Sequence, residues 1–317
     1  MLFHILVFYL KKVIKMKVLI TGGAGFIGSH LADKLVEMGC QVSIIDNLST
    51  GKLENINPAV YHWNEDLNKI PIEDLISYLK GVKYVFHLAA KTSVEESIQN
   101  PTLYLNHNLY GMTKLLSACA KSGVKRFIFS SSSSVYGEAT VVPTPETIPT
   151  NPLSPYALSK LQGEKLCKLY SNVYNLDTVS LRYFNAYGER MNEEGSYKLV
   201  IPIFAELIKQ GKPCTIVNDG KQKRDFVYVK DIVNANIRAA TNQADLFGSV
   251  FNIGNGENYS VNELADAMGG EKVYGEKRIE PFETQANNVK ARVRLGWTPK
   301  TNLLNWLKTY MNDNKNK

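Results

Sequence analysis

Residues 18–31 read VLITGGAGFIGSHL, an apolar run that ends at four closely spaced glycines. The apolar start predicts a buried strand, and glycines at 22, 23, 25 and 28 predict a tight turn that opens a helix. Glycine tolerates positive φ and leaves space for a phosphate beside the backbone, while a helix start offers free N–H groups. This order of strand, turn and helix predicts a dinucleotide-binding site.

Asp46 follows the next apolar run, residues 42–45, and stands 18 positions after the last glycine of the turn. A carboxylate at this point accepts hydrogen bonds from the adenosine ribose and repels a 2′-phosphate. Asn47 comes next, and not an arginine that would bind such a phosphate. The pair therefore predicts NAD as the cofactor instead of NADP, although Asp46 and Asn47 are also ordinary turn residues.

Tyr156 and Lys160 lie one helical turn apart, after two prolines, Pro152 and Pro155, that indicate a helix start. Free tyrosine ionises near pH ~10, and a neighbouring ammonium stabilises its phenolate. The pair can therefore move a proton, although the same spacing is common on surface helices. Residues 129–137, FSSSSSVYG, place serine hydroxyls at a strand end just before it. Spacing alone does not show which serine would act.

Apolar runs alternate with helix-patterned segments from residue 18 to about residue 185. This alternation predicts an α/β fold, a Rossmann-like doubly wound parallel sheet with a smaller C-terminal α/β substrate-binding lobe. The expected division is an N-terminal extension over 1–15, a dinucleotide-binding domain over 16–185 with 225–255 returning to it, and a substrate-binding lobe from 186–224 and 256–317.

The composition is that of an ordinary globular protein, with 44% hydrophobic and 21% charged residues among 317 and a net charge of +7. The basic residues are scattered, so we do not expect nucleic-acid binding. Four cysteines without close spacing and five dispersed histidines predict reduced thiols and no metal site. The apolar residues 2–10 are too short to span a bilayer, and we expect a cytoplasmic protein without a membrane partner.

Seven motifs together resemble the extended short-chain dehydrogenases/reductases of the NAD-dependent epimerase/dehydratase group. The chain is most similar there to the UDP-glucose (UDP-galactose) 4-epimerases and their UDP-N-acetylglucosamine relatives. The motifs are TGGAGFIGSHL (21–31), DNLSTG (46–51), HLAA (87–90), SSSVYG (132–137), SPYALSK (154–160), LRYFNAYG (181–188) and RDFVYVKD (224–231).

The resemblance implies a set of site residues, taken position by position from the matching motifs. The catalytic residues it implies are Ser132, Tyr156 and Lys160. The cofactor-binding residues are Gly22, Gly25, Phe26, Ile27, Gly28, Asp46, Asn47, Asp66, Leu67, Leu88, Ala89, Ala90, Lys91, Asn108, Tyr156, Lys160 and Tyr183. The substrate-binding residues are Ser132, Tyr156, Asn185, Arg224, Arg278 and Thr284.

Two departures from the group's patterns bear on the reaction. Dehydratases and decarboxylases of the group carry an acid directly after the catalytic Ser/Thr, where this chain has Ser133 and Ser134, which favours epimerisation. The segment 278–287 lacks the group's usual glycine, and its Thr284 is small enough to admit an N-acetyl group at the sugar C2.

The resemblance therefore implies a 4-epimerase of UDP-hexoses that oxidises C4 transiently to a 4-keto sugar, lets it rotate and reduces it again. The substrate would be UDP-glucose/UDP-galactose, UDP-GlcNAc/UDP-GalNAc, or both. The alternatives are epimerisation of another nucleotide sugar such as UDP-glucuronate, net oxidoreduction of a nucleotide sugar, and, least expected, an NAD-binding regulator without turnover. It also implies a homodimer built through the helices near 108–121 and 156–172.

Overall fold

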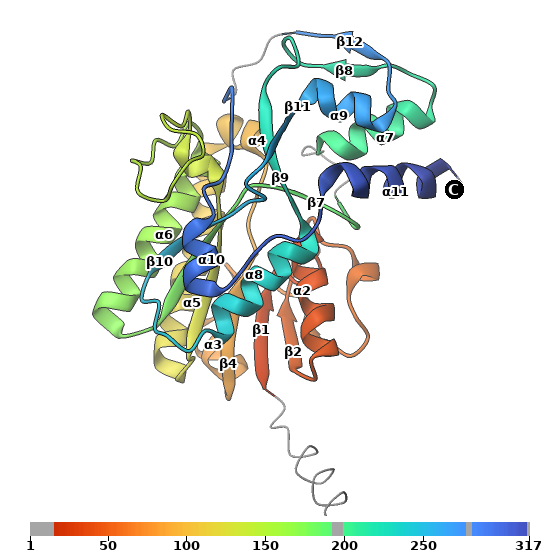
Figure 1. Ribbon diagram of the computed structural model, residues 1–317. Helices are drawn as coiled ribbons and strands as arrows, with labels where there is room; N and C mark the ends of the chain where they lie inside the picture. The colour runs from red at the N-terminus through yellow and green to blue at the C-terminus, as the bar shows by residue number, and fades with distance from the viewer. Residues whose placement is uncertain (1–15, 192–198, 277–280, 316–317) are drawn as a thin grey trace, which may run out of the picture.

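The computed structural model describes residues 16–191, 199–276 and 281–315, so the expected extension over 1–15 lies outside the described residues. Its main strands are β1 (Lys17–Thr21), β2 (Gln41–Ile45), β3 (Tyr61–Trp63), β4 (Val82–His87), β5 (Arg126–Ser132), β6 (Thr178–Tyr183) and β10 (Ser249–Ile253). They form one parallel sheet in the order β10-β6-β5-β4-β1-β2-β3 (Figure 1). The order reverses beside β1, as in a doubly wound fold, and the predicted fold class is confirmed.

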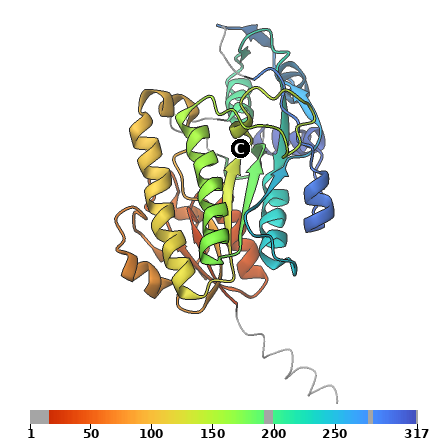
Figure 2. The ribbon, with the colours of Figure 1, turned by 90° about the vertical axis from the view of Figure 1, so that its left-hand side faces the viewer.

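Helices cover both faces of this sheet. One face carries α2 (Phe26–Glu37), α8 (Val229–Thr241) and α10 (Val289–Leu295), and the other carries α3 (Ile72–Tyr78), α5 (Pro101–Ser122) and α6 (Pro155–Tyr174), near α4 (Val94–Gln99). Successive residues of a strand face opposite sides, so Val18 and Ile20 join one apolar cluster while Leu19 joins the other. A strand buried on both faces must be apolar throughout, which explains the unbroken run in β1. Helices α5 and α6 lie side by side (Figure 2).

A second group of elements lies beyond the carboxyl ends of the main strands (Figure 1). It contains a three-stranded sheet, a two-stranded sheet and three helices around a third apolar cluster. The elements are β7 (Asn185–Tyr187), β9 (Lys223–Tyr228), β11 (Asn258–Ser260), β8 (Cys214–Ile216), β12 (Lys272–Tyr274), α7 (Val200–Lys209), α9 (Val261–Met268) and α11 (Leu303–Lys315). The chain returns to the main sheet with β10, which pairs with β6. The expected division into two lobes stays a prediction.

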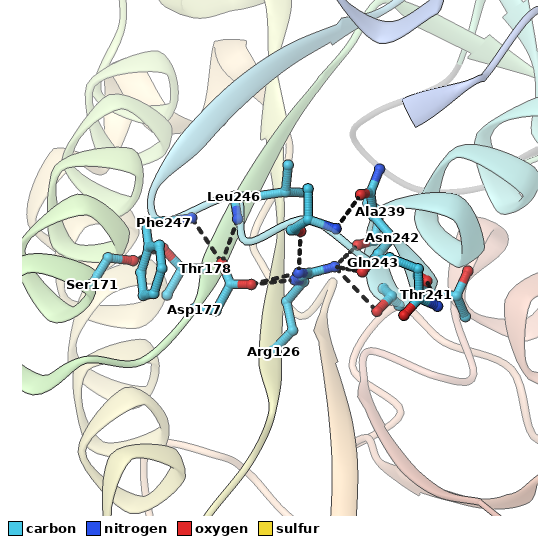
Figure 3. Close-up of polar contacts among 12 residues, drawn as sticks. Arg126, Ser171, Asp177, Thr178, Ala239, Thr241, Asn242, Gln243, Leu246 and Phe247 are labelled. Carbon is cyan, nitrogen blue, oxygen red and sulfur yellow. Dashed lines mark hydrogen bonds and ion pairs between the residues drawn. The ribbon is translucent and has the colours of Figure 1, made fainter. Parts of the chain in front are cut away.

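A buried ion pair joins Arg126, at the amino end of β5, to Asp177, which directly precedes β6 (Figure 3). The Arg126 side chain is fully buried, and its Nε lies 2.6 Å from Oδ2 of Asp177. The same guanidinium donates to the carbonyl oxygens of Ala239 and Asn242 at 2.7 and 3.0 Å, among others. The second carboxylate oxygen accepts the N–H of Phe247 at 2.8 Å. Arg126 thus neutralises Asp177 and also bonds to the last carbonyl groups of α8. Removing either side chain would leave the charge of the other buried without a counterion.

Asp177→Asn is expected to lower the free energy of unfolding by about 3 kcal/mol, because it leaves the buried Arg126 charge without its counterion. The midpoint of urea denaturation, followed by circular dichroism, measures this loss. Lys34→Ala is the control, since it breaks the exposed Lys34–Glu37 pair and should change stability by less than about 1 kcal/mol. Equal effects of the two variants would contradict the role given to the buried pair.

Candidate active site

The predicted site residues cluster at the carboxyl edge of the main sheet. β1 ends at Thr21 beside the glycine turn, Asp46 follows β2, and Leu88 follows β4. The next two strands end at Ser132 and Tyr183, which are paired in register. Parallel strands place all their carboxyl ends on one edge, where open α/β folds bind ligands. The topology thus gathers residues as far apart in the sequence as Thr21 and Tyr183.

The glycine turn forms a cradle that side chains would fill. Gly22 has φ of +73°, and a Cβ there would lie 2.7 Å from the backbone nitrogen of Ala89. A Cβ on Gly28 would overlap the carbonyl oxygen of Gly22. The first backbone bond of α2 runs from the Ser29 N–H to the Gly25 oxygen at 3.0 Å, so the preceding N–H groups, those of Phe26, Ile27 and Gly28, have no acceptor within the helix. These donors and the open space fit the pyrophosphate of a dinucleotide.

Asp46 is both a turn residue and an oriented carboxylate. Its Oδ2 accepts the Ala24 N–H at 2.9 Å, and its Oδ1 accepts the Leu48 N–H at 2.9 Å. The Asn47 side chain accepts the Ser49 N–H at 3.1 Å. Each carboxylate oxygen keeps a second lone pair, so Asp46 can still accept from ribose hydroxyls. The two interpretations of this pair in the sequence are therefore compatible.

Helix α5 fixes the loop that carries Asp66 and Leu67. Asn68 Oδ1 accepts the Gly111 N–H at 2.8 Å, and Lys114 Nζ donates to the carbonyl oxygen of Asn68 at 2.9 Å. Leu67 is buried, whereas Asp66 is partly exposed. This arrangement leaves an acid and an apolar surface next to each other, and the cofactor contact expected at Asp66 and Leu67 stays a prediction. Asn68 and Lys114 were not among the predicted site residues, because neither spacing nor residue type distinguishes side chains that hold a loop in place.

Asn108 connects the loop after β4 to the start of α6. Its Oδ1 accepts the Lys91 N–H at 2.8 Å, and its Nδ2 donates to the Lys91 oxygen at 3.1 Å. The same Nδ2 donates to Ser159 Oγ at 2.9 Å, and that hydroxyl donates to the Tyr156 carbonyl oxygen at 2.7 Å. The segment of Leu88, Ala89, Ala90 and Lys91 is thereby tied to the turn that carries Tyr156.

Helix α6 presents Tyr156 and Lys160 on one face. Ser154 caps the helix by accepting the Ala157 N–H at 3.1 Å, and Pro155 occupies its first position. Lys160 Nζ lies 5.8 Å from the centre of the Tyr156 ring and donates to the Ser130 carbonyl oxygen at 2.8 Å. Burial lowers the pKa of Lys160 to about 8. Tyr156 stays partly exposed at the carboxyl edge, so a substrate can reach its ring.

The serine segment and Tyr183 lie next to this helix. Ser132 Oγ accepts the Ser134 N–H at 3.2 Å, where a short 3-10 helix, η2 (Ser133–Tyr136), begins. The Tyr183 hydroxyl lies 3.0 Å from Ser130 Oγ and accepts from Asn236 Nδ2 at 2.8 Å. Asn236 is fully buried on α8 and holds the Tyr183 ring in place. It is a further residue that sequence reasoning missed.

Strand β9 brings three of the predicted substrate-binding residues together. Asn185 Nδ2 donates to the Asp225 carbonyl oxygen at 2.9 Å. Arg224 is partly exposed on β9, and Thr284 donates its N–H to the Lys223 carbonyl oxygen at 3.0 Å. The structure therefore places Asn185, Arg224 and Thr284 around one strand. Arg278 lies outside the described residues.

The Asp225 carboxylate organises the backbone around that strand. It is fully buried and accepts the N–H groups of Asn255, Gly256 and Ala286 at 2.7, 2.9 and 2.9 Å. Burial raises its pKa to about 6, against the opposing effect of these hydrogen bonds. Asp225 stands inside the motif RDFVYVKD at residues 224–231, but only its neighbour Arg224 was predicted as a site residue. The sequence did contain one indication of this role, because Asp225 is an acid directly before the apolar residues 226–229.

Two broader properties concern the described ranges alone. Within residues 16–191, 199–276 and 281–315, no three His, Cys, Asp or Glu side chains are grouped so that they could hold a metal ion. Over the same ranges, none of the helices combines the length and apolar character needed to cross a bilayer.

Gly22→Ala is expected to weaken NAD binding about tenfold or more, equivalent to ~1.4 kcal/mol, because the added methyl group would displace the Ala89 backbone. Gly39→Ala is a matched control, since Gly39 has a similar φ of +79° but open space around its Cβ position. Both variants carry the strain of positive φ, and only the first disturbs the cradle. Titration of the apoprotein with NAD, followed by fluorescence or calorimetry, compares them. Equal NAD affinity in both variants would exclude a cofactor at this turn.

Comparison with known proteins agrees with this geometry. Residues 18–254 match the NAD dependent epimerase/dehydratase family. The chain is 39% identical to a putative UDP-glucose 4-epimerase of Methanocaldococcus jannaschii, over 94% of this chain and 98% of that protein. The structure of UDP-glucose 4-epimerase from Thermotoga maritima with UDP-glucose superposes with a TM-score of 0.89 at 39% identity, covering 95% of this chain and 99% of that one. A UDP-N-acetylglucosamine 4-epimerase from Methanobrevibacter ruminantium gives a TM-score of 0.87 at 37% identity, covering 94% and 97%. The protein therefore belongs to the NAD dependent epimerase/dehydratase family.

Proposed function

We propose that this protein is an NAD-dependent 4-epimerase of UDP-hexoses, acting on UDP-glucose/UDP-galactose, on UDP-GlcNAc/UDP-GalNAc, or on both. One observation carries the proposal: α6 holds Tyr156 and the buried Lys160 at the sheet edge that also carries the glycine cradle. Of the two similar solved structures, one is a UDP-glucose 4-epimerase and the other a UDP-N-acetylglucosamine 4-epimerase. This similarity supports both substrate classes.

In this proposal Tyr156, as phenolate, takes the proton of the sugar C4 hydroxyl, and Ser132 donates a hydrogen bond to the same oxygen. The Lys160 ammonium, fixed by Ser130, stabilises the negative charge on the phenolate oxygen. When bound in the glycine cradle, NAD would supply the hydride transfer, by which the C4 hydride leaves the sugar and is delivered back to the opposite face of C4. The resulting 4-keto sugar turns about its bond to the diphosphate before Tyr156 gives the proton back.

The residues around β9 would hold the other end of the substrate. Arg224 offers a forked set of donors to a diphosphate, and Asn185 lies on the neighbouring strand β7. Thr284 Oγ1 is buried and has no hydrogen-bond partner in the described structure, so a polar group of the substrate can use it. Its small size leaves space for an N-acetyl group, which is why both substrate classes are proposed.

Ser133 and Ser134 favour epimerisation over loss of water or of CO2, because neither side chain supplies the acid that the resemblance associates with those reactions. Epimerisation of UDP-glucuronate and net oxidoreduction remain the alternatives among enzymes, and release of NADH during turnover would identify the latter. A regulator without turnover would have no use for a proton-transfer pair, whereas here the chain keeps Tyr156, Lys160 and Ser132.

Incubation with UDP-galactose and with UDP-GalNAc, followed by separation of the nucleotide sugars, tests the proposal directly. Formation of the C4 epimer without net NADH is the expected result. A protein that binds NAD but converts neither sugar would contradict it.

Tyr156→Phe is expected to lower kcat by about 10² or more, because it removes the group that moves the proton. Bound NAD should stay near the level of the unaltered protein, since the ring and the Lys160 contact to Ser130 remain. Conversion of the preferred UDP-sugar and the NAD content after gel filtration measure the two effects. Undiminished conversion would remove Tyr156 from the mechanism.

We also propose a homodimer through α5 and α6. These neighbouring helices expose large apolar side chains, namely Leu103, Tyr110, Leu169, Val173 and Tyr174. Soluble proteins rarely leave such a set of side chains in water, and a second copy of the same face would cover it.

Val173→Glu is expected to convert the dimer to a monomer, because it places a charge in the apolar contact while Val173 itself is 61% exposed in the single chain. Light scattering after gel filtration gives the mass. Val293→Glu on α10 is the control, since Val293 is 76% exposed away from that face. A monomeric unaltered protein, or a dimer that survives Val173→Glu, would contradict this arrangement.

A further inference from the structure

A second buried ion pair lies directly behind the proposed catalytic residues. Glu164 follows Lys160 by one turn on α6, and Arg182 lies on β6. Arg182 Nε donates to Glu164 Oε1 at 2.8 Å, and its Nη2 donates to Oε2 at 2.7 Å. Their side chains are only 5% and 6% exposed. The contact is bidentate, so it fixes both the distance and the angle between the helix and the strand.

The same carboxylate also holds the serine segment. Ser131 Oγ donates to Glu164 Oε1 at 2.5 Å, and Ser131 directly precedes Ser132. One turn earlier on α6, Lys160 Nζ donates to the Ser130 carbonyl oxygen. Helix α6 therefore bonds to two successive residues of β5, just before the residue that faces the substrate in the proposed mechanism. These two bonds determine how far α6 can slide along the strand.

The Arg182 guanidinium extends this arrangement to the end of the serine segment. It lies over the Tyr136 ring, 4.6 Å from the ring centre, and the Tyr136 hydroxyl donates to Asn252 Oδ1 at 2.7 Å. Packing is tight at the same level, because a Cβ on Gly163 would overlap the Phe129 ring. The helix, β5 and β6 are thus locked together immediately below the carboxyl edge.

We propose that Glu164 is a positioning residue that sets the placement of Tyr156 relative to Ser132, acting through Ser131 and Arg182. The inference rests on the proposed function, in which those two side chains bind one substrate oxygen. A buried ion pair adds little stability over well-packed apolar side chains of similar volume, because desolvation offsets the attraction. Apolar side chains, however, have no directional bonds with which to align a helix and a strand. Small displacements of reacting groups are costly for the rate, so alignment is the function that the charges supply.

The pair Arg126–Asp177 supplies a matched comparison. It also joins an arginine to a buried acid, but Arg126 lies at the amino end of β5, away from the site (Figure 3). A purely structural role for Glu164 predicts that both pairs affect stability alone. A positioning role predicts that only the pair at the carboxyl edge affects kcat.

The experiment measures kcat, KM, NAD content and urea stability for Glu164→Gln, Ser131→Ala and Asp177→Asn. The assay uses whichever of UDP-galactose and UDP-GalNAc the unaltered protein epimerises. Glu164→Gln and Ser131→Ala are expected to lower kcat about tenfold or more, with KM within twofold and NAD retained. Asp177→Asn is expected to keep kcat at a temperature where it is folded. Ser131→Ala leaves the ion pair intact and tests the link independently of the folding of Glu164→Gln.

The double variant Glu164→Leu/Arg182→Met separates alignment from stability. It is expected to regain stability relative to Glu164→Gln, because no charge stays buried alone, while kcat stays low. The inference is overturned when Glu164→Gln and Ser131→Ala keep kcat within twofold, or when the double variant regains kcat together with stability. An unaltered protein that epimerises neither sugar would overturn the proposed function itself, and this inference with it.

Discussion

The hydrogen bond from Lys160 Nζ to the Ser130 carbonyl oxygen is the contact on which the rest of the site depends. Burial of an ammonium is costly, and burial lowers the pKa of Lys160 to about 8. The backbone carbonyl offsets part of that cost without neutralising the charge, so the ammonium can still act on a neighbouring phenolate. The same bond fastens α6 to β5. One hydrogen bond therefore both places a positive charge near Tyr156 and aligns α6, which carries Tyr156, with β5, which ends at Ser132.

The surrounding architecture converts this contact into a site. The main sheet buries apolar side chains on both faces, so its strand ends are held rigidly. Polar side chains then attach the irregular segments: Asn108 holds the loop after β4, and Asp225 holds the backbone around β9. Each of these side chains bonds to backbone atoms of a segment distant in sequence. Loops that would otherwise be free to move are therefore placed by a few buried hydrogen bonds.

Local sequence patterns were sufficient to predict those helices, strands and turns whose boundaries are set by neighbouring residues. The glycine turn, β1 and α2 follow from steric and periodic rules, as the pattern of residues 18–31 predicted. Helix α5 also has local signals at both ends, because Pro101 occupies its first position and Gly123 ends it in the left-handed conformation. The sequence also indicated which residue types could handle a proton and a hydride. It did not indicate how β7, β9 and β11 would assemble, since those strands have three to six residues and pair across long intervals.

The sequence did not reveal the residues that only position other side chains, such as Glu164 and Arg182. Glu164 and Arg182 are 18 positions apart, on a helix and a strand, and nothing in the spacing distinguishes Glu164 from an exposed helix acid. Burial is what makes the Glu164–Arg182 pair a positioning contact, because a charge in an apolar interior must form hydrogen bonds of defined geometry. An acid exposed to solvent at this position could change rotamer freely, so it would not align α6 with β5 and β6. Burial depends on the packing of α6 against β5 and β6, so the positioning contacts of this site become visible only when the fold is known.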